Sequence, residues 1–281
     1  MQTIRAAKAM AAWAAAHHRE GVTIGLVPTM GALHAGHLAL IRAARLSCDA
    51  VVVSLFVNPA QFGPKEDFSR YPRKPRPDAL LCAKEGVDVL FAPPVGEIYP
   101  DGFQASVSVP KLARRWEGAL RPGHFEGVAT VVTKLLTLVR PTAAFFGQKD
   151  FQQAALIRRL VEDLNLGARV IVYPTVREAD GLALSSRNVY LTPAQRRAAP
   201  VLFQALKAGR AAIRNGVLSG TKIKQIMRTA LSAEPMVRLD YLAACDPDTL
   251  EPFTRIRERT VLLGAVRIGG IRLIDNLLVT R

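Results

Sequence analysis

Apolar positions in the first part of the chain alternate between short continuous runs and helical spacing. The stretches "VTIGLVP" (22–28) and "AVVVSLFVN" (50–58) are continuous apolar runs rich in β-branched residues, which is typical of strands covered on both faces. Between them, residues 37–48 carry apolar side chains at helical spacing. A strand, a glycine-containing loop, a helix and a second strand in this order predict a βαβ unit with a parallel sheet.

The alternation continues to about residue 175. The patterns predict further helices over 77–85, 125–139 and 151–165, the last with Asp150 as its N-cap, and strands over 87–93, 142–147 and 169–176. The first 20 residues predict a surface helix, because their apolar core is mostly alanine and a strand pattern follows at once. We therefore expect an α/β fold: a Rossmann-like, doubly wound parallel sheet over residues 1–175.

The pattern changes after residue 175. Residues 192–216 and 219–233 predict helices, the first with Thr192 as a cap and Pro193 at its first position. Strand patterns follow at 237–246, 260–270 and 271–279, and Gly269-Gly270 between the last two indicates a hairpin. We expect a smaller C-terminal α+β domain over residues 176–281 that closes over the site.

Composition and charge narrow the functional classes. No apolar run is long enough to span a bilayer, so we expect no membrane partner. The three cysteines are odd in number and widely spaced, which argues against a disulfide framework and a zinc ribbon and favours reduced thiols in the cytoplasm. The net charge of +15 indicates anionic partners. Nucleic acid is one class, but only 6% of residues are aromatic and like charges are dispersed, which argues against RNA.

Polar side chains follow four of the five predicted strands of the first domain. "TMGALHAGH" follows the strand at 22–28, and Asn58 and Gln61 follow the strand at 50–57. "GQKD" follows the strand at 142–146, and "TVREADGLALSSRN" follows the strand that ends near 174. Because ligands of open α/β sheets bind at the carboxyl ends of the strands, we expect these groups to form one site.

His34 and His37 lie in a loop that opens a helix, where free N–H groups and the helix dipole favour an anion. The pair could donate hydrogen bonds to phosphate, ligate a metal, or merely cap the turn. A metal would need further ligands, which no nearby cysteine or H-E-x-x-H supplies. Neither G-x-G-x-x-G after the first strand nor a Walker A loop is present. Lys149 lies at a helix start, where the helix dipole disfavours a cation, and this favours a phosphate group as its partner. The segment "LSSRN" is either part of the same site or only the residues of a turn.

Five blocks together resemble the pantoate–β-alanine ligase family of the H-x-G-H nucleotidylyltransferases. They are, in the family's order, "PTMGALHAGH", "FVNPAQFGPKEDFSRYPR", "RPGHFEGVATVV", "FFGQKDFQQ" and "PTVREADGLALSSRNVYL". The blocks cover residues 28–192, and the chain length fits the whole enzyme. Five ordered blocks are far more specific than H-x-G-H alone.

The resemblance implies that pantoate attacks the α-phosphate of ATP to give pantoyl adenylate and pyrophosphate, and that β-alanine then displaces AMP to give pantothenate. It implies ATP-binding residues (Met30, Gly31, Ala32, Leu33, His34, Ala35, Gly36, His37, Gly147, Gln148, Lys149, Asp150, Val176, Leu184, Ser185, Ser186 and Arg187) and pantoate or β-alanine residues (Gln61, Gln153, Asn58 and His124). Of these, His37, His34, Lys149, Ser185 and Arg187 would be catalytic.

The resemblance also implies Mg²⁺ and a homodimer. Asp78 matches an acidic position, but the segment 71–78 has few carboxylates, so the metal would be held mainly by ATP phosphates and water. One alternative is another H-x-G-H adenylyltransferase that acts on a different small carboxylic acid. The C-terminal domain is short for an enzyme acting on tRNA. A nucleic-acid-binding protein without catalysis is suggested only by the charge.

Overall fold

The computed structural model describes residues 1–64 and 66–281. Lys65, which lies in one of the five family blocks, is outside the described residues. The chain divides into two compact units. Met1–Gly147 and Leu156–Pro174 form the first, while Gln148–Ala155 and Thr175–Arg281 form the second. The chain enters the second unit twice, at Gln148 and at Thr175. The entry at Thr175 lies where the sequence pattern changes. The sequence pattern does not change at the short segment Gln148–Ala155.

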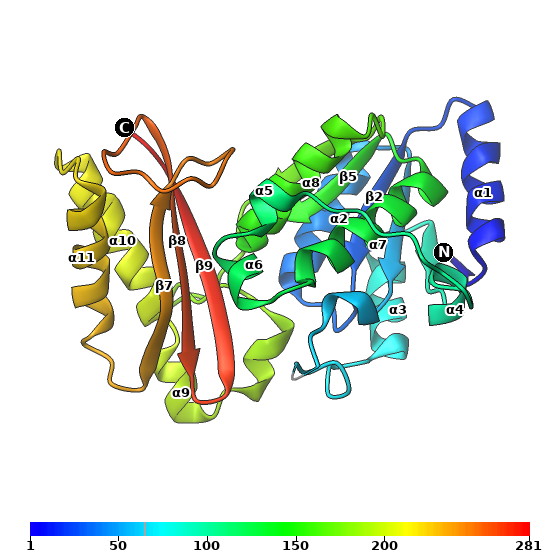
Figure 1. The fold of residues 1–281 in the computed structure, drawn as a ribbon. Coiled ribbons are helices and arrows are strands. Elements are labelled where there is room, and N and C mark those ends of the chain that lie inside the picture. The colour runs from blue at the N-terminus through cyan, green and yellow to red at the C-terminus, as the bar shows by residue number, and fades with distance from the viewer. Residues whose placement is uncertain (65) are drawn as a thin grey trace. The chain divides into compact units, whose positions relative to one another are not determined.

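The first unit is built on a parallel sheet of six strands in the order β1-β4-β3-β2-β5-β6. The strands are β1 (Gln2–Ile4), β2 (Ile24–Thr29), β3 (Ala50–Leu55), β4 (Val89–Phe91), β5 (Ala143–Gly147) and β6 (Arg169–Tyr173). The helices are α1 (Ala7–Arg19), α2 (Ala35–Ser47), α3 (Pro75–Lys84), α4 (Val95–Ile98), α5 (Pro110–Ala113), α6 (Glu117–Leu120), α7 (His124–Val139) and α8 (Phe151–Asp163), whose first turn belongs to the second unit. The predicted α/β fold with a parallel sheet is confirmed (Figure 1).

Both faces of this sheet are buried, as the continuous apolar runs predict. On one face Val27, Val53 and Phe145 form a cluster with Leu40 and Ile41 of α2. The intervening strand residues are buried as well, including Leu26, Val52 and Ala144, each without exposed surface. Successive side chains of a strand point to opposite faces, so these two sets require cover on both sides.

The sequence pattern missed β1, which pairs with β4 at the edge of the sheet. A strand of three residues with one buried side chain is too short to produce a periodic signal. Asp150 was expected to cap α8, but it ends a 3₁₀ turn (Gln148–Asp150) that runs directly into the helix.

The second unit contains an antiparallel sheet, β7 (Val237–Cys245), β8 (Arg259–Ile268) and β9 (Ile271–Thr280), in the order β7-β8-β9. Its helices are α9 (Pro193–Ala198), α10 (Val201–Arg214) and α11 (Gly220–Leu231), of which α10 and α11 pack along the sheet (Figure 1). The hairpin at Gly269-Gly270 is confirmed, and so is the Thr192 cap with Pro193 behind it. The single helix expected over 192–216 is two, because Pro200 lacks the N–H that a continuous helix needs.

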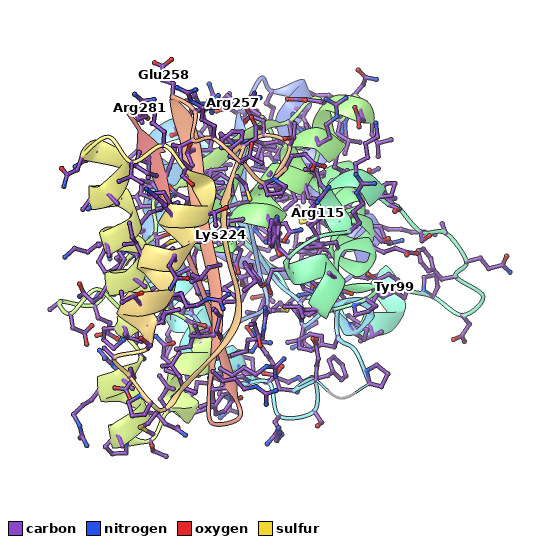
Figure 2. The ribbon with its side chains drawn as sticks, turned by 60° about the vertical axis from the view of Figure 1, so that its left-hand side comes forward. Tyr99, Arg115, Lys224, Arg257, Glu258 and Arg281 are labelled. Atoms are coloured by element: carbon purple, nitrogen blue, oxygen red, sulfur yellow. The ribbon has the colours of Figure 1, made fainter. Side chains whose placement is uncertain are left out.

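Figure 2 shows Arg257, Glu258 and Arg281 gathered at one end of this sheet, where the Arg281 N–H donates to the Glu258 carbonyl (3.1 Å). The three cysteines are free and buried. Burial raises the pKa of the Cys82 thiol to about 12. Over residues 1–64 and 66–281, no helix is long and apolar enough to cross a membrane.

Candidate active site

The loop after β2 is shaped by a buried carboxylate. Gly31 and Ala32 both have positive φ (88° and 50°), a conformation that is costly for alanine. The two oxygens of Asp78, at the start of α3, accept the N–H groups of Ala32 and Leu33 at 2.8 Å each and hold this turn. A Cβ on Gly31 would lie 2.9 Å from Leu55 and 3.1 Å from Asp78, so only glycine fits there.

His34 and His37 cap α2 reciprocally. The Nδ1 atom of His34 accepts the Gly36 N–H (3.1 Å), and Nδ1 of His37 accepts the His34 N–H (3.3 Å). The rings lie 4.1 Å apart. Because each Nδ1 acts as an acceptor, the neutral rings carry their hydrogen on Nε2. The capping role considered for this pair is therefore present, and it gives each ring an Nε2 donor of the kind that suits an anion.

Asn58 and Gln61 lie together just after the end of β3. The Asn58 amide donates to Gln61 Oε1 (3.1 Å) and to the carbonyl of Gly127 on α7 (3.0 Å). Its oxygen accepts from Tyr99 (2.8 Å), a side chain labelled in Figure 2. Gln61 Nε2 in turn lies 3.0 Å from the Met30 sulfur. The amide of Gln61 is thus directed toward the loop that carries the two histidines.

His124 fixes the backbone of Gln61 from the first turn of α7. Its Nδ1 lies 2.8 Å from the Gln61 carbonyl, and its Nε2 lies 3.0 Å from Arg121. Burial, aided by the neighbouring Arg121 charge, lowers the pKa of His124 to about 4. A neutral ring with the hydrogen on Nδ1 satisfies both contacts. Arg121 also pairs with Glu66 (2.6 Å); burial raises the pKa of that carboxyl, but Arg121 prevails and holds it below its usual value.

In the second unit, Gln148 and Lys149 of the "GQKD" block are held by β9. Asn276 is 1% exposed, and its amide nitrogen donates to the carbonyls of Gln148 (2.8 Å) and Lys149 (3.0 Å). Its oxygen accepts from the Gln148 side chain (3.1 Å). The Lys149 ammonium lies 3.6 Å from Asp150 Oδ1. The three hydrogen bonds therefore fix the backbone of Lys149 and both the backbone and the side chain of Gln148. None of them involves the Lys149 ammonium group.

The segment that leads to Ser185 is anchored to the same strand. Arg177 makes a two-pronged ion pair with Asp275 (2.6 and 2.8 Å) and donates to the Gly181 carbonyl (3.0 Å). Its guanidinium also lies 3.9 Å from the centre of the Phe203 ring. Burial raises the pKa of the Asp275 carboxyl, and the Arg177 charge opposes that rise.

Ser185 Oγ accepts the Arg187 N–H (3.3 Å) and opens the 3₁₀ turn Ser186–Tyr190, so the turn chemistry considered for "LSSRN" is present. Val176 and Leu184 are joined by a backbone hydrogen bond (3.0 Å) and form the base of this segment. Gln153 lies half-buried on α8, in the same unit as Lys149.

Among residues 1–64 and 66–281, no group of three or more histidine, cysteine or acidic side chains could hold a metal. Both oxygens of Asp78, the expected acidic position, already accept backbone N–H groups. The residues therefore do not fit a dedicated metal cage. A cavity of about 450 Å³ adjoins Met30 and Gly31, lined mostly by apolar residues together with Arg5, Arg73 and Lys74 and the carboxylates Asp78 and Glu97, so the neighbourhood of the loop is open.

Within the first unit, the structure brings Met30, Asn58, Gln61 and His124 together, and within the second it brings Gln148 and Lys149 to β9. The sequence argument missed Tyr99, Arg121, Asp275 and Asn276. Arg121 stands in the quoted block "RPGHFEGVATVV", but Asp275 and Asn276 lie outside every block. Their only signal was a pair of polar residues inside the apolar strand pattern "IRLIDNLLV".

Comparison with known proteins decides the family. The model of the Pantoate-beta-alanine ligase family matches residues 2–278. The chain belongs to this family.

Relatives match this family member over nearly its whole length. A Pantothenate synthetase of Heliobacterium modesticaldum is 51% identical over 279 residues, which cover 99% of each chain. One from Roseiflexus castenholzii is 54% identical over 253 residues, covering 90% of this chain and 91% of the relative. The crystal structure of Pantothenate Synthetase from Thermus thermophilus is 50% identical, with a TM-score of 0.94 and 99% of both chains covered. The Pantoate-beta-alanine Ligase of Francisella tularensis, complexed with Beta-gamma ATP and Beta-alanine, is 35% identical, with a TM-score of 0.81 over 99% of this chain and 97% of that one.

Proposed function

We propose that this protein joins pantoate to β-alanine with ATP, giving pantothenate, AMP and pyrophosphate. Full-length membership of the Pantoate-beta-alanine ligase family carries this proposal. The open cavity beside Met30 and the fixed amide of Gln61 support a small ligand bound next to this loop. The Francisella tularensis relative is complexed with Beta-gamma ATP and Beta-alanine, which supports ATP and β-alanine as substrates here.

In the first step a carboxylate oxygen of pantoate attacks the α-phosphorus of ATP, and the bond to the bridging oxygen of pyrophosphate breaks. A carboxylate is already a nucleophile, so the barrier lies in charge repulsion and positioning. The Nε2–H groups of His34 and His37 can donate hydrogen bonds to the negative charge that develops on the phosphate oxygens. The positive charges of Lys149 and Arg187 can stabilise the same negative charge. In the second step the amine of β-alanine attacks the acyl carbon, the bond to AMP breaks, and the amine loses a proton.

We assign ATP binding to Met30–His37, Gly147–Asp150, Val176 and Leu184–Arg187. This assignment rests on the family resemblance, and the Nε2 donors of the two histidines support it. Gln61 and Gln153 are assigned to pantoate and β-alanine, with Asn58 and His124 as the groups that orient Gln61. Ser185 is assigned a catalytic role beside Arg187.

We propose that Mg²⁺ enters as the complex with ATP, because the described side chains offer it no cage. Removal of divalent ions should abolish turnover, and added Mg²⁺ should restore it. We also propose a homodimer, which light scattering during size-exclusion chromatography would test, and a cytoplasmic location, which reduced buried cysteines support.

The deciding experiment is ATP–pyrophosphate exchange with pantoate present and β-alanine absent. We expect exchange that depends on pantoate, and AMP release only after β-alanine is added. Other small hydroxy acids, tested in parallel, should give far less exchange. Exchange with another acid but not with pantoate would assign the protein to a different adenylyltransferase, and a folded protein with no exchange would overturn the mechanism.

A further inference from the structure

Two neighbouring residues of β9, Asp275 and Asn276, bind the two segments of the second unit that carry its catalytic candidates. Asn276 donates two hydrogen bonds to the backbone carbonyls of Gln148 and Lys149 and accepts a third from the Gln148 side chain, and Asp275 holds Arg177 through a bidentate ion pair. Successive side chains of a strand point to opposite faces, which is how neighbours on one strand reach different segments. Neither residue belongs to the nucleotide-binding blocks found in the sequence.

The side chains of Asp275 and Asn276 are buried, and their hydrogen-bonding groups all have partners. Asp275 and Asn276 are 5% and 1% exposed. Both donors and the acceptor of the Asn276 amide have partners, and both oxygens of Asp275 accept from Arg177. A buried hydrogen-bonded network in which every donor and acceptor is satisfied has one preferred geometry. It therefore restricts the conformations of the segments that it binds.

The network continues from Arg177 to Ser185. Arg177 donates to the Gly181 carbonyl, while the backbone of Leu184 returns to Val176, so the intervening residues form a closed loop. Gly181 has φ +96°, and a Cβ there would lie 2.3 Å from Phe203, the ring on which Arg177 stacks. The path from β9 to Ser185 is therefore tightly packed.

We propose that Asp275 and Asn276 are positioning residues that set Lys149 and the Ser185–Arg187 turn in a fixed mutual arrangement for attack on the α-phosphate. The inference rests on the proposed function, because it assigns those groups to ATP. Neither residue touches the reacting atoms. Each acts through the backbone or side chain that it holds, which is the arrangement expected of groups that support a catalytic side chain.

The test separates positioning from folding. Asn276→Ala removes all three hydrogen bonds to the Lys149 segment. We expect kcat for pantoate-dependent exchange, normalised to folded protein, to fall about 10- to 100-fold, the loss typical of misplacement near 1 Å. KM for ATP should change less than about 3-fold, because the lost interaction matters mainly in the transition state. Arg177→Lys, which keeps the charge but loses the two-pronged geometry, should give a smaller loss of the same kind.

Asp240→Asn is the matched control. Asp240 on β7 pairs with Arg267 of β8 and Arg272 of β9, so the change breaks an acidic–arginine contact of the same sheet without touching either loop. It should leave kcat unchanged.

The outcomes are distinct. If Asn276→Ala folds and keeps the wild-type kcat, or if it loses activity only in proportion to its unfolded fraction, the positioning role is overturned while the proposed function stands. If Asn276→Ala does not fold, Arg177→Lys decides in the same way: a normal kcat per folded molecule overturns the role. If wild-type protein shows no pantoate-dependent exchange, the proposed function fails, and the positioning role fails with it.

Discussion

Acidification should destabilise the first unit through His124. The pKa of this buried ring is lowered from 6.5 to about 4, so the folded state binds its proton less readily than the unfolded state does. The stabilisation is therefore fully present above pH 6.5 and is lost as the pH falls from 6.5 toward 4. With these two values, linkage gives a loss of about 2 kcal/mol between pH 7.5 and pH 5.0, since one pKa unit corresponds to about 1.4 kcal/mol.

Urea unfolding at the two pH values measures this loss. The chain has two tryptophans, Trp13 on α1 and Trp116 before α6, and both belong to the first unit, so their fluorescence reports on that unit. His124→Gln provides the control because it cannot titrate, although its amide can still donate to the Gln61 carbonyl. The pKa of Glu66 is also lowered, but that contribution is lost mainly at lower pH, below the usual range of a glutamate.

The wild-type protein should lose about 2 kcal/mol more than His124→Gln on going from pH 7.5 to pH 5.0. Equal losses in the two proteins would refute the reasoning, because they would show that burial does not keep the ring neutral.

Three further results are expected. Gly127→Ala should cost about 1–3 kcal/mol in urea unfolding and raise KM for pantoate, because its Cβ would lie 2.2 Å from the Ala60 carbonyl in the turn that carries Gln61; an unchanged KM would contradict this. His37→Ala should lower kcat about 100-fold while calorimetry finds nearly unchanged ATP affinity, and equal losses in both would argue against a role in the transition state. The Cys82 thiol, without exposed surface and with a pKa raised to about 12 by burial, should resist iodoacetamide in the folded protein and react in urea; labelling under native conditions, read by mass spectrometry, would show that its surroundings open.

The sequence predicted the parts of the fold that rest on long apolar patterns. The strands β2, β3 and β5 and the helices α2 and α7 are found within a few residues of their predicted limits, because each buries a continuous run or a clear stripe. The strand β1 and the short helices α4 to α6 were missed, since three or four residues cannot establish a period.

The site was predictable where polar groups follow strands directly. Asn58 and Gln61 follow β3 directly, and they contact each other because the chain turns at once after this strand. Asn276 could not be predicted in the same way. Its partners, Gln148 and Lys149, lie more than 120 residues away in the chain, and no local pattern encodes a contact that the packing of β9 creates. The division of the chain at Gln148–Ala155 escaped notice for the same reason.

The contact between Asn276 and the Lys149 segment also has a consequence for biosynthesis. The two sites are separated by 127 residues, so Asn276 leaves the ribosome well after Lys149. At about 5–20 residues per second, Lys149 is made roughly 6–25 s before its partner exists. The nascent chain can therefore complete much of the sheet of the first unit while the lysine loop still lacks its support. Termination between residues 175 and 275 would yield a chain that holds every residue of the first unit but lacks Asn276, and that product should be catalytically weak because its lysine segment is not held.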